Sequence, residues 1–89
     1  ATPFAPGGLP GACGFAIQDT DFVAALSPAN FAGGDHCGTV FTVESTGTSV
    51  TVKVGDECVE CSGNGLDLTI SAFEVLAPLS AGEVEVTYA

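Results

Sequence analysis

Four cysteines, several aspartates, one histidine and one lysine are the residues of this chain that could carry chemistry. Cys58 and Cys61 form a C-x-x-C pair, and Cys13 and Cys37 stand apart from it. A zinc site would use Cys58, Cys61 and Cys37, with either Cys13 or His36 as the fourth ligand. A redox site would use the C-x-x-C pair alone, in a βαβ context that the sequence does not show. We favour a third interpretation, two structural disulfides, because short cysteine-rich chains are typical of secreted proteins.

The expected pairs are Cys13–Cys37 and Cys58–Cys61, with no metal ion and no cofactor. The first disulfide closes a loop of about 25 residues, which contributes about 3.5 kcal/mol of stability in the chain-entropy account. The second closes a very short loop and contributes about 2 kcal/mol at most.

Two aspartates stand out by their neighbours. Asp67 lies between Leu66 and Leu68, and a carboxyl group buried by such neighbours can keep a proton and donate it. Asp56 comes shortly after the strand-like run 50–54, with Gly55 between them. For both residues the alternative is a structural aspartate that forms hydrogen bonds in a turn or cap.

The remaining polar and aromatic residues do not form a recognisable site. His36 lies in the glycine-rich loop 33–36 without a nucleophile beside it, and Lys53 falls on the solvent side of its strand. There is no Trp and a single Tyr, and the six Phe mostly fit core positions. The sequence therefore predicts no aromatic platform for polysaccharide.

The elements that would position these residues are mostly β-strands. In residues 49–54 three valines alternate with polar residues, which is typical of a half-buried strand, and with residues 38–43 this run predicts a β-hairpin. Further strands are expected at 22–26, 66–68 and 84–88. Short helices are expected after Ser27, an N-cap followed by Pro28, and at 70–77. The pattern predicts a mostly β protein, and closing the strands into a small barrel would remove exposed edges.

Two segments of the chain are weakly similar to each other. Ser27-Pro28-Ala29-Asn30-Phe31 corresponds to Thr69-Ile70-Ser71-Ala72-Phe73, and a short apolar run precedes each. Two related β-helix-β halves would explain the similarity, and chance is the alternative.

Size and charge limit the function further. The 89 residues suffice for one domain, residues 1–89, with a small core. Eleven acidic residues against one basic residue give a net charge of −10, which argues against nucleic acid and anionic membrane surfaces as partners. No apolar run is long enough to span a bilayer. We therefore expect a secreted protein that is monomeric through charge repulsion and binds neutral or basic partners.

Several linked motifs make the sequence resemble a known family. They are, in order, GACG at 11–14, VAALS at 23–27, CGTVFTV at 37–43, VTVKVGDECVEC at 50–61 and LDLTISAF at 66–73. In this order and spacing they resemble the barwin-like or expansin-like domain of the small fungal type. Loosenin-like proteins and secreted cysteine-protease inhibitors belong to this group.

The resemblance implies a six-stranded double-psi β-barrel with one or two short helices, and it supports the disulfide pairing given above. It also implies a polar groove across the barrel, in which Thr2, Asp56 and Asp67 would bind a ligand. Two departures from the family concern this groove. Pro3 follows Thr2 in the first strand, and Glu57 stands where arginine is frequent, which makes the groove more acidic.

The small relatives imply binding and loosening of cell-wall polysaccharide, such as chitin, cellulose or another glucan, without hydrolysis. The enzymatic alternative is inverting hydrolysis with Asp56 and Asp67 as the acid–base pair. A second functional hypothesis is inhibition of a papain-like cysteine protease, or an effector role that uses the barrel as a scaffold. A storage, surface or signalling protein with an empty groove is the third.

Overall fold

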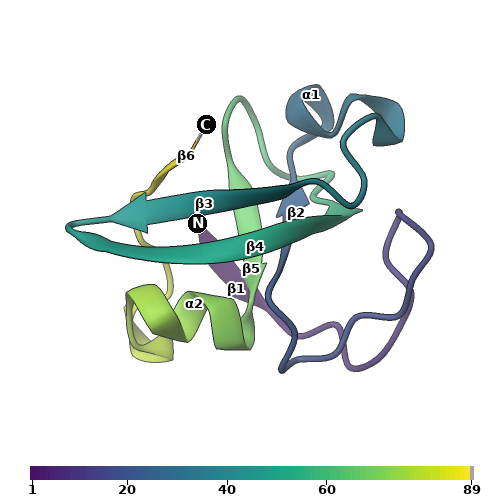
Figure 1. The fold of residues 1–89 in the computed structure, drawn as a ribbon. Helices are drawn as coiled ribbons and strands as arrows, with labels where there is room; N and C mark the ends of the chain where they lie inside the picture. The colour runs from purple at the N-terminus through teal and green to yellow at the C-terminus, as the bar shows by residue number, and fades with distance from the viewer. Residues whose placement is uncertain (89) are drawn as a thin grey trace.

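A computed structural model describes residues 1–88, and Figure 1 shows the fold. The strands form one sheet in the order β1-β5-β2-β4-β3-β6. Their bounds are β1 (Thr2–Phe4), β2 (Val23–Leu26), β3 (Val40–Ser45), β4 (Thr48–Glu57), β5 (Leu66–Thr69) and β6 (Thr87–Tyr88). The helical elements are α1 (Pro28–Phe31), α2 (Ile70–Leu76) and the 3₁₀ turns η1 (Ala32–Gly34) and η2 (Leu79–Ala81). The mostly β class and the short helices agree with the prediction.

The sheet mixes parallel and antiparallel pairs. β1 runs parallel to β5 and β2 parallel to β4, whereas the pairs β2–β5, β3–β4 and β3–β6 are antiparallel. Within residues 1–88 no ladder joins the edge strands β1 and β6, so the paired sheet itself is open there. The Ala1 amino group donates to the Val84 carbonyl at 2.6 Å, and the Val84 amide donates to the Ala1 carbonyl at 3.0 Å. These two bonds connect the edges of the sheet, as a barrel-like arrangement requires.

One face of the sheet packs against α2 and forms the core. In β4 the alternating side chains Val50, Val52 and Val54 are buried, as the period-two pattern predicts. Phe73 of α2 is fully buried, and α2 lies beneath the β3–β4 hairpin in Figure 1. The other buried members of the cluster are Ala24, Leu26, Phe31, Val43, Leu66, Leu68 and Ala72.

The segment between β1 and β2, rich in proline and glycine, folds over the opposite face of the sheet. Its Ile17 is fully buried. A Cβ at Gly55 of β4 would lie 2.6 Å from Val23 Cγ1, 2.9 Å from Phe15 Cζ and 3.2 Å from Ile17 Cδ1. The Cys13 amide also donates to the Gly55 carbonyl at 3.2 Å. Glycine at position 55 therefore permits this segment to lie directly against β4.

The weak internal similarity corresponds to a repeated structural unit. In β2-α1 and in β5-α2 a strand leads directly into a short helix. Ser27 and Thr69 are the two N-cap residues, and both are fully buried. Phe31 and Phe73 both enter the core, and β2 and β5 lie side by side, antiparallel. The structure therefore supports the hypothesis of two related halves.

The bounds of three elements differ from the prediction. β4 continues to Glu57, so Asp56 lies inside this strand and not after it. β3 begins only at Val40. β6 is limited to two residues opposite Val43 and Glu44, because Val84, predicted to be part of this strand, is bonded to Ala1 at the other edge of the sheet.

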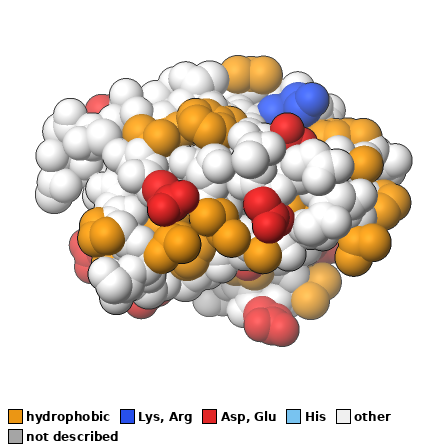
Figure 2. Space-filling view, turned by 90° about the horizontal axis from the view of Figure 1, so that it is seen from below, with side chains coloured by type: hydrophobic (Ala, Val, Ile, Leu, Met, Phe, Trp, Pro, Cys, Tyr) orange, Lys and Arg blue, Asp and Glu red, His pale blue; other side chains and the backbone are white. Residues whose placement is uncertain are grey.

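The surface is acidic and in places apolar. Figure 2 shows acidic side chains set among hydrophobic ones on the face seen from below. Val75 of α2 and Leu79 of η2 each expose 41% of their surface. No helix in residues 1–88 has the length and apolarity needed to cross a membrane.

Candidate functional site

Thr2, Asp56 and Asp67 come from three different strands, and the register of the sheet places them in one row. Thr2 lies opposite Asp67, and Asp67 lies opposite Ala25. Ala25 in turn lies opposite Asp56. Residues directly opposite one another in a sheet point to the same face. The next residues along β2 and β5 belong to the core cluster, so this row faces away from that cluster.

Asp67 is bound to Thr2 at the edge of the sheet. The Thr2 hydroxyl donates a hydrogen bond to Asp67 Oδ1, and both residues are half-buried. Leu66 and Leu68 point into the core, so they do not enclose the carboxyl group as their sequence neighbourhood suggested. Pro3 is compatible with this arrangement because β1 is an edge strand, where a missing backbone donor is tolerated.

A β-bulge at Gly55 directs Asp56 to the same face of the sheet, away from the core cluster. The register of the β2–β4 pair shifts between Ala24 and Ala25, whose partners are Val54 and Asp56. Strict alternation from the buried Val54 would point side chain 56 into the core. The extra residue reverses this direction, and Asp56 therefore joins the row.

Asp56 is also held by the segment between β1 and β2, which covers this face of the sheet. Its Oδ1 atom accepts hydrogen bonds from the Ala12 amide and from the Glu57 amide, both at 2.8 Å. Two strand spacings separate Asp56 from Asp67, so their Cα atoms are about 10 Å apart. One carboxylate thus supports the covering segment, and the other is bound to a hydroxyl at the sheet edge.

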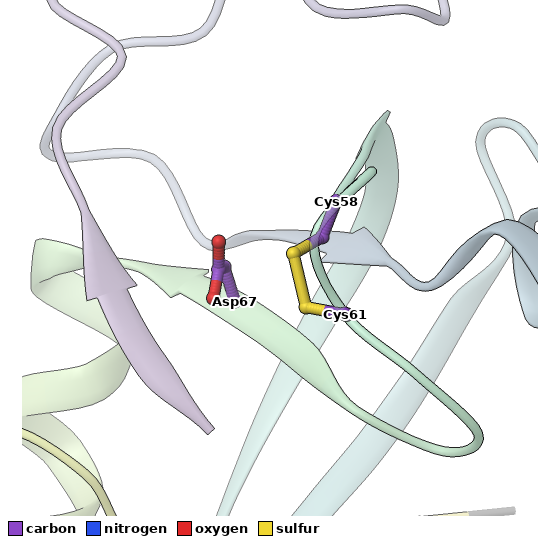
Figure 3. Close-up of side chains that lie close together, drawn as sticks. All are labelled: Cys58, Cys61 and Asp67. Carbon is purple, nitrogen blue, oxygen red and sulfur yellow. A yellow bond between two sulfur atoms is a disulfide. The ribbon is translucent and has the colours of Figure 1, made fainter.

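Both expected disulfides are present in the structure, Cys13–Cys37 and Cys58–Cys61. Figure 3 shows the second disulfide beside the Asp67 carboxylate, and a carboxylate oxygen and the two sulfurs lie within 4.8 Å of one another. No cysteine among the described residues is free. Zinc binds cysteine as the thiolate. All four sulfurs are bonded in disulfides, so none is a thiolate, and the zinc interpretation is wrong for this oxidised chain.

His36 and Lys53 take no part in the row. His36 is exposed in the loop between η1 and β3. The Lys53 ammonium lies 4.5 Å from the centre of the Phe15 ring, which is a cation–π contact. A pocket of about 470 Å³ includes His36 but none of the three residues of the row.

Sequence reasoning missed the residues that shape the row. Ala25 is the small spacer between the two carboxylates, and the Ala12 amide fixes one of them. The available signal was Gly55, because an isolated glycine in a strand pattern, here one residue before Asp56, suggests a bulge.

The fold defines the class of this protein, a barwin-like, expansin-like double-psi β-barrel. Residues 23–88 match the model of the family described as lytic transglycolase. The chain belongs to this family. Ripening-related protein 6 of Oryza sativa subsp. japonica is 38% identical over 90 residues, which cover 92% of this chain and 54% of that protein.

Two solved structures are similar over nearly the whole chain. A mutant of Clavibacter michiganensis expansin in complex with cellohexaose superimposes with a TM-score of 0.90 at 28% identity, covering 99% of this chain and 46% of that chain. The Streptomyces papain inhibitor superimposes with a TM-score of 0.83 at 29% identity, covering 98% of this chain and 86% of that chain. The chain thus spans about half the length of the rice protein and of the expansin.

Proposed function

We propose that this protein is secreted and binds a cell-wall polysaccharide, either chitin, cellulose or another glucan, along the row of Thr2, Asp67 and Asp56. The observation that carries the proposal is the row itself, in which sheet register aligns three polar side chains from separate strands. The similarity to an expansin whose structure contains cellohexaose supports it. The two disulfides support the secreted location.

The spacing of the row suits an extended sugar chain. With Cα atoms about 10 Å apart, the carboxylates of Asp67 and Asp56 can bind separate hydroxyl groups of one chain. Thr2 occupies one oxygen of Asp67 and leaves the other for a ligand hydroxyl. Hydrogen bonds made here would compete with those between neighbouring polysaccharide chains, which loosens the material without breaking a glycosidic bond.

We propose binding without hydrolysis, because the contacts of Asp56 give it a positioning role and not that of a catalytic base. An inverting hydrolase needs a carboxylate that activates a water molecule opposite the acid. In this structure Asp56 Oδ1 accepts two backbone hydrogen bonds that hold the covering segment. Its role is therefore to position that segment and to bind a ligand.

The test is depletion of the protein from solution by insoluble cellulose, chitin and chitosan, at acid and neutral pH, with and without salt. Asp67→Asn replaces a charge-assisted hydrogen bond by a neutral one, which costs about 1 kcal/mol, so this variant should bind roughly fivefold more weakly. Asp35→Asn is the matched control, because Asp35 is exposed in a loop outside the row. The assay for soluble reducing ends should stay at background.

Equal adsorption by Asp67→Asn and the unaltered protein at every pH would contradict the role of Asp67. Adsorption that salt abolishes on chitosan, with none on cellulose or chitin, would reduce the interaction to net charge. Release of soluble sugar that requires both Asp56 and Asp67 would replace the binding proposal by the hydrolase alternative.

A second candidate function is inhibition of a papain-like cysteine protease. The observation that favours it is the similarity to the Streptomyces papain inhibitor over 86% of that chain. The Cys13–Cys37 disulfide ties the N-terminal segment to the loop that contains His36. A binding loop held in this way loses less entropy on association. Tight inhibition of papain that survives Asp67→Asn but is lost on replacing Cys13 and Cys37 would favour this function.

We propose further that residues 1–89 act as one monomeric domain without a cofactor. A net charge of −10 opposes self-association and favours neutral or basic partners. Sedimentation at low and high salt tests this, because a dimer that forms only at high salt would identify charge repulsion as the cause.

A further inference from the structure

A pocket of about 470 Å³ lies apart from the row, where α1, the loop before β5, the start of β3 and β6 meet. Leu26 and Val54 of the core cluster form part of its lining. Phe41 and Tyr88 supply aromatic surface, with ring centres 5.4 Å apart and planes tilted by 47°. The volume is in the range of small-molecule sites.

A network of hydrogen bonds forms one wall of the pocket before any ligand arrives. The Asn30 side-chain amide donates to the Tyr88 hydroxyl at 2.9 Å and to Asn64 Oδ1 at 3.2 Å. The Tyr88 hydroxyl donates to the Asn64 carbonyl at 2.8 Å. The Ser27 hydroxyl donates to the Gly63 carbonyl at 2.6 Å, which ties the same loop to α1. Side chains from three separate parts of the chain are thus held in place.

The pocket also contains polar groups that make no hydrogen bond within residues 1–88. These are the imidazole of His36 and the hydroxyls of Thr39 and Thr87, all three on exposed residues. Each of them can both donate and accept a hydrogen bond. Such groups are suited to bind the hydroxyl groups of a ligand, because a hydroxyl can also both donate and accept a hydrogen bond.

The lining contains no carboxylate and no Lys or Arg, although the chain has 11 acidic residues. A cationic ligand would find no counter-charge there, and an anionic ligand would be repelled by the net charge of −10. We propose that this pocket binds a single neutral pyranose ring, whose apolar face packs on Tyr88 and Phe41 and whose hydroxyls bond to Thr39, Thr87 and His36. The site is separate from the row proposed to bind polysaccharide.

The test is a titration of the isotope-labelled protein with methyl β-glucopyranoside, followed by amide chemical shifts. Glucuronate and cyclohexanol serve as anionic and hydroxyl-poor comparisons. We expect shifts confined to the pocket, with a dissociation constant in the millimolar range for so small a ligand, and weaker binding of both comparison molecules. Thr87→Val should weaken binding about three- to tenfold by removing one hydrogen bond. Thr42→Val, an exposed threonine of β3 outside the pocket, is the matched control.

Absence of shifts at about 100 mM ligand, well above that millimolar range, would overturn the proposal. Shifts centred on Asp67 would do the same, as would equal losses in the Thr87→Val and Thr42→Val variants. Tighter binding of cyclohexanol than of the glucoside would show an apolar pocket and not a sugar site. Absence of shifts at the pocket leaves adsorption to insoluble polymer untouched, because adsorption depends on the row, and shifts centred on Asp67 would support the row while overturning the pocket proposal.

Discussion

Removing the two disulfides separately should affect stability to different extents. Cys13–Cys37 has a sequence separation of 24 and Cys58–Cys61 a separation of 3. The stabilisation grows with the logarithm of loop length in the chain-entropy account, which gives about 3.5 kcal/mol for the first and about 2 kcal/mol for the second. Replacing both cysteines of the first pair by serine should therefore cost about 1.5 kcal/mol more than replacing both of the second. For a domain of this size the difference corresponds to roughly 6–12 °C in Tm.

Adsorption to polymer should be affected in the opposite order, with the larger loss in the variant without Cys58–Cys61. The Cys58–Cys61 disulfide lies within 4.8 Å of the Asp67 carboxylate and closes the turn after β4. At a temperature where both variants are folded, the variant without this pair should therefore lose more adsorption than the variant without Cys13–Cys37.

Urea unfolding monitored by circular dichroism gives the stabilities, because the chain contains no Trp for fluorescence. Depletion by the polymer that the unaltered protein binds gives the second quantity. If the variant without Cys58–Cys61 proves as unstable as the variant without Cys13–Cys37, or less stable, then loop entropy does not determine how much these disulfides stabilise the fold. If both variants adsorb equally well, the surroundings of Asp67 do not depend on its neighbouring disulfide.

Three further changes test the packing and the charge of the molecule. Gly55→Ala should destabilise the fold by about 1–3 kcal/mol, measured by urea unfolding, because the new methyl group would lie 2.6 Å from Val23 Cγ1 and 2.9 Å from Phe15 Cζ. Thr69→Val should cost about 1–3 kcal/mol in the same assay, because the buried hydroxyl donates to the Asp21 carbonyl at 2.5 Å; an unchanged midpoint would contradict this. Any component of chitosan binding that arises from the net charge of −10 should disappear above about 0.5 M salt, and its persistence would indicate specific contacts.

Much of the fold could be predicted from local patterns. The valine alternation of residues 49–54 identified β4 and its buried face, and Ser27-Pro28 marked the start of α1, where the Ser27 hydroxyl accepts a hydrogen bond from the Asn30 amide at 3.4 Å. These features depend on neighbouring residues alone. The family resemblance supplied the six-stranded double-psi barrel as the arrangement of these strands, which periodicity does not contain.

The candidate site was less accessible from the sequence. The strand predicted at 66–68 already implies that Leu66 and Leu68 point to the face opposite Asp67. What the local sequence does not contain is which residues of neighbouring strands lie beside Asp67, here Thr2 and Ala25. The pocket near Tyr88 could not be predicted either. It is formed by residues from α1, β3, the loop before β5 and β6, and none of these segments has a motif of its own.

Because of the bulge at Gly55, a change in the number of residues in β4 would alter the direction of the Asp56 side chain but not that of Asp67. Asp56 faces away from the core cluster only while the number of residues between it and the buried valines of β4 is preserved. Deleting one residue there would exchange the inward and outward sets of side chains from that point on. The direction of Asp67 is instead set by the pairing of β5 with β1 and β2. Relatives of this protein should therefore vary in length at the 46–47 turn and in the loop 59–65, and keep residues 50–57 constant in number.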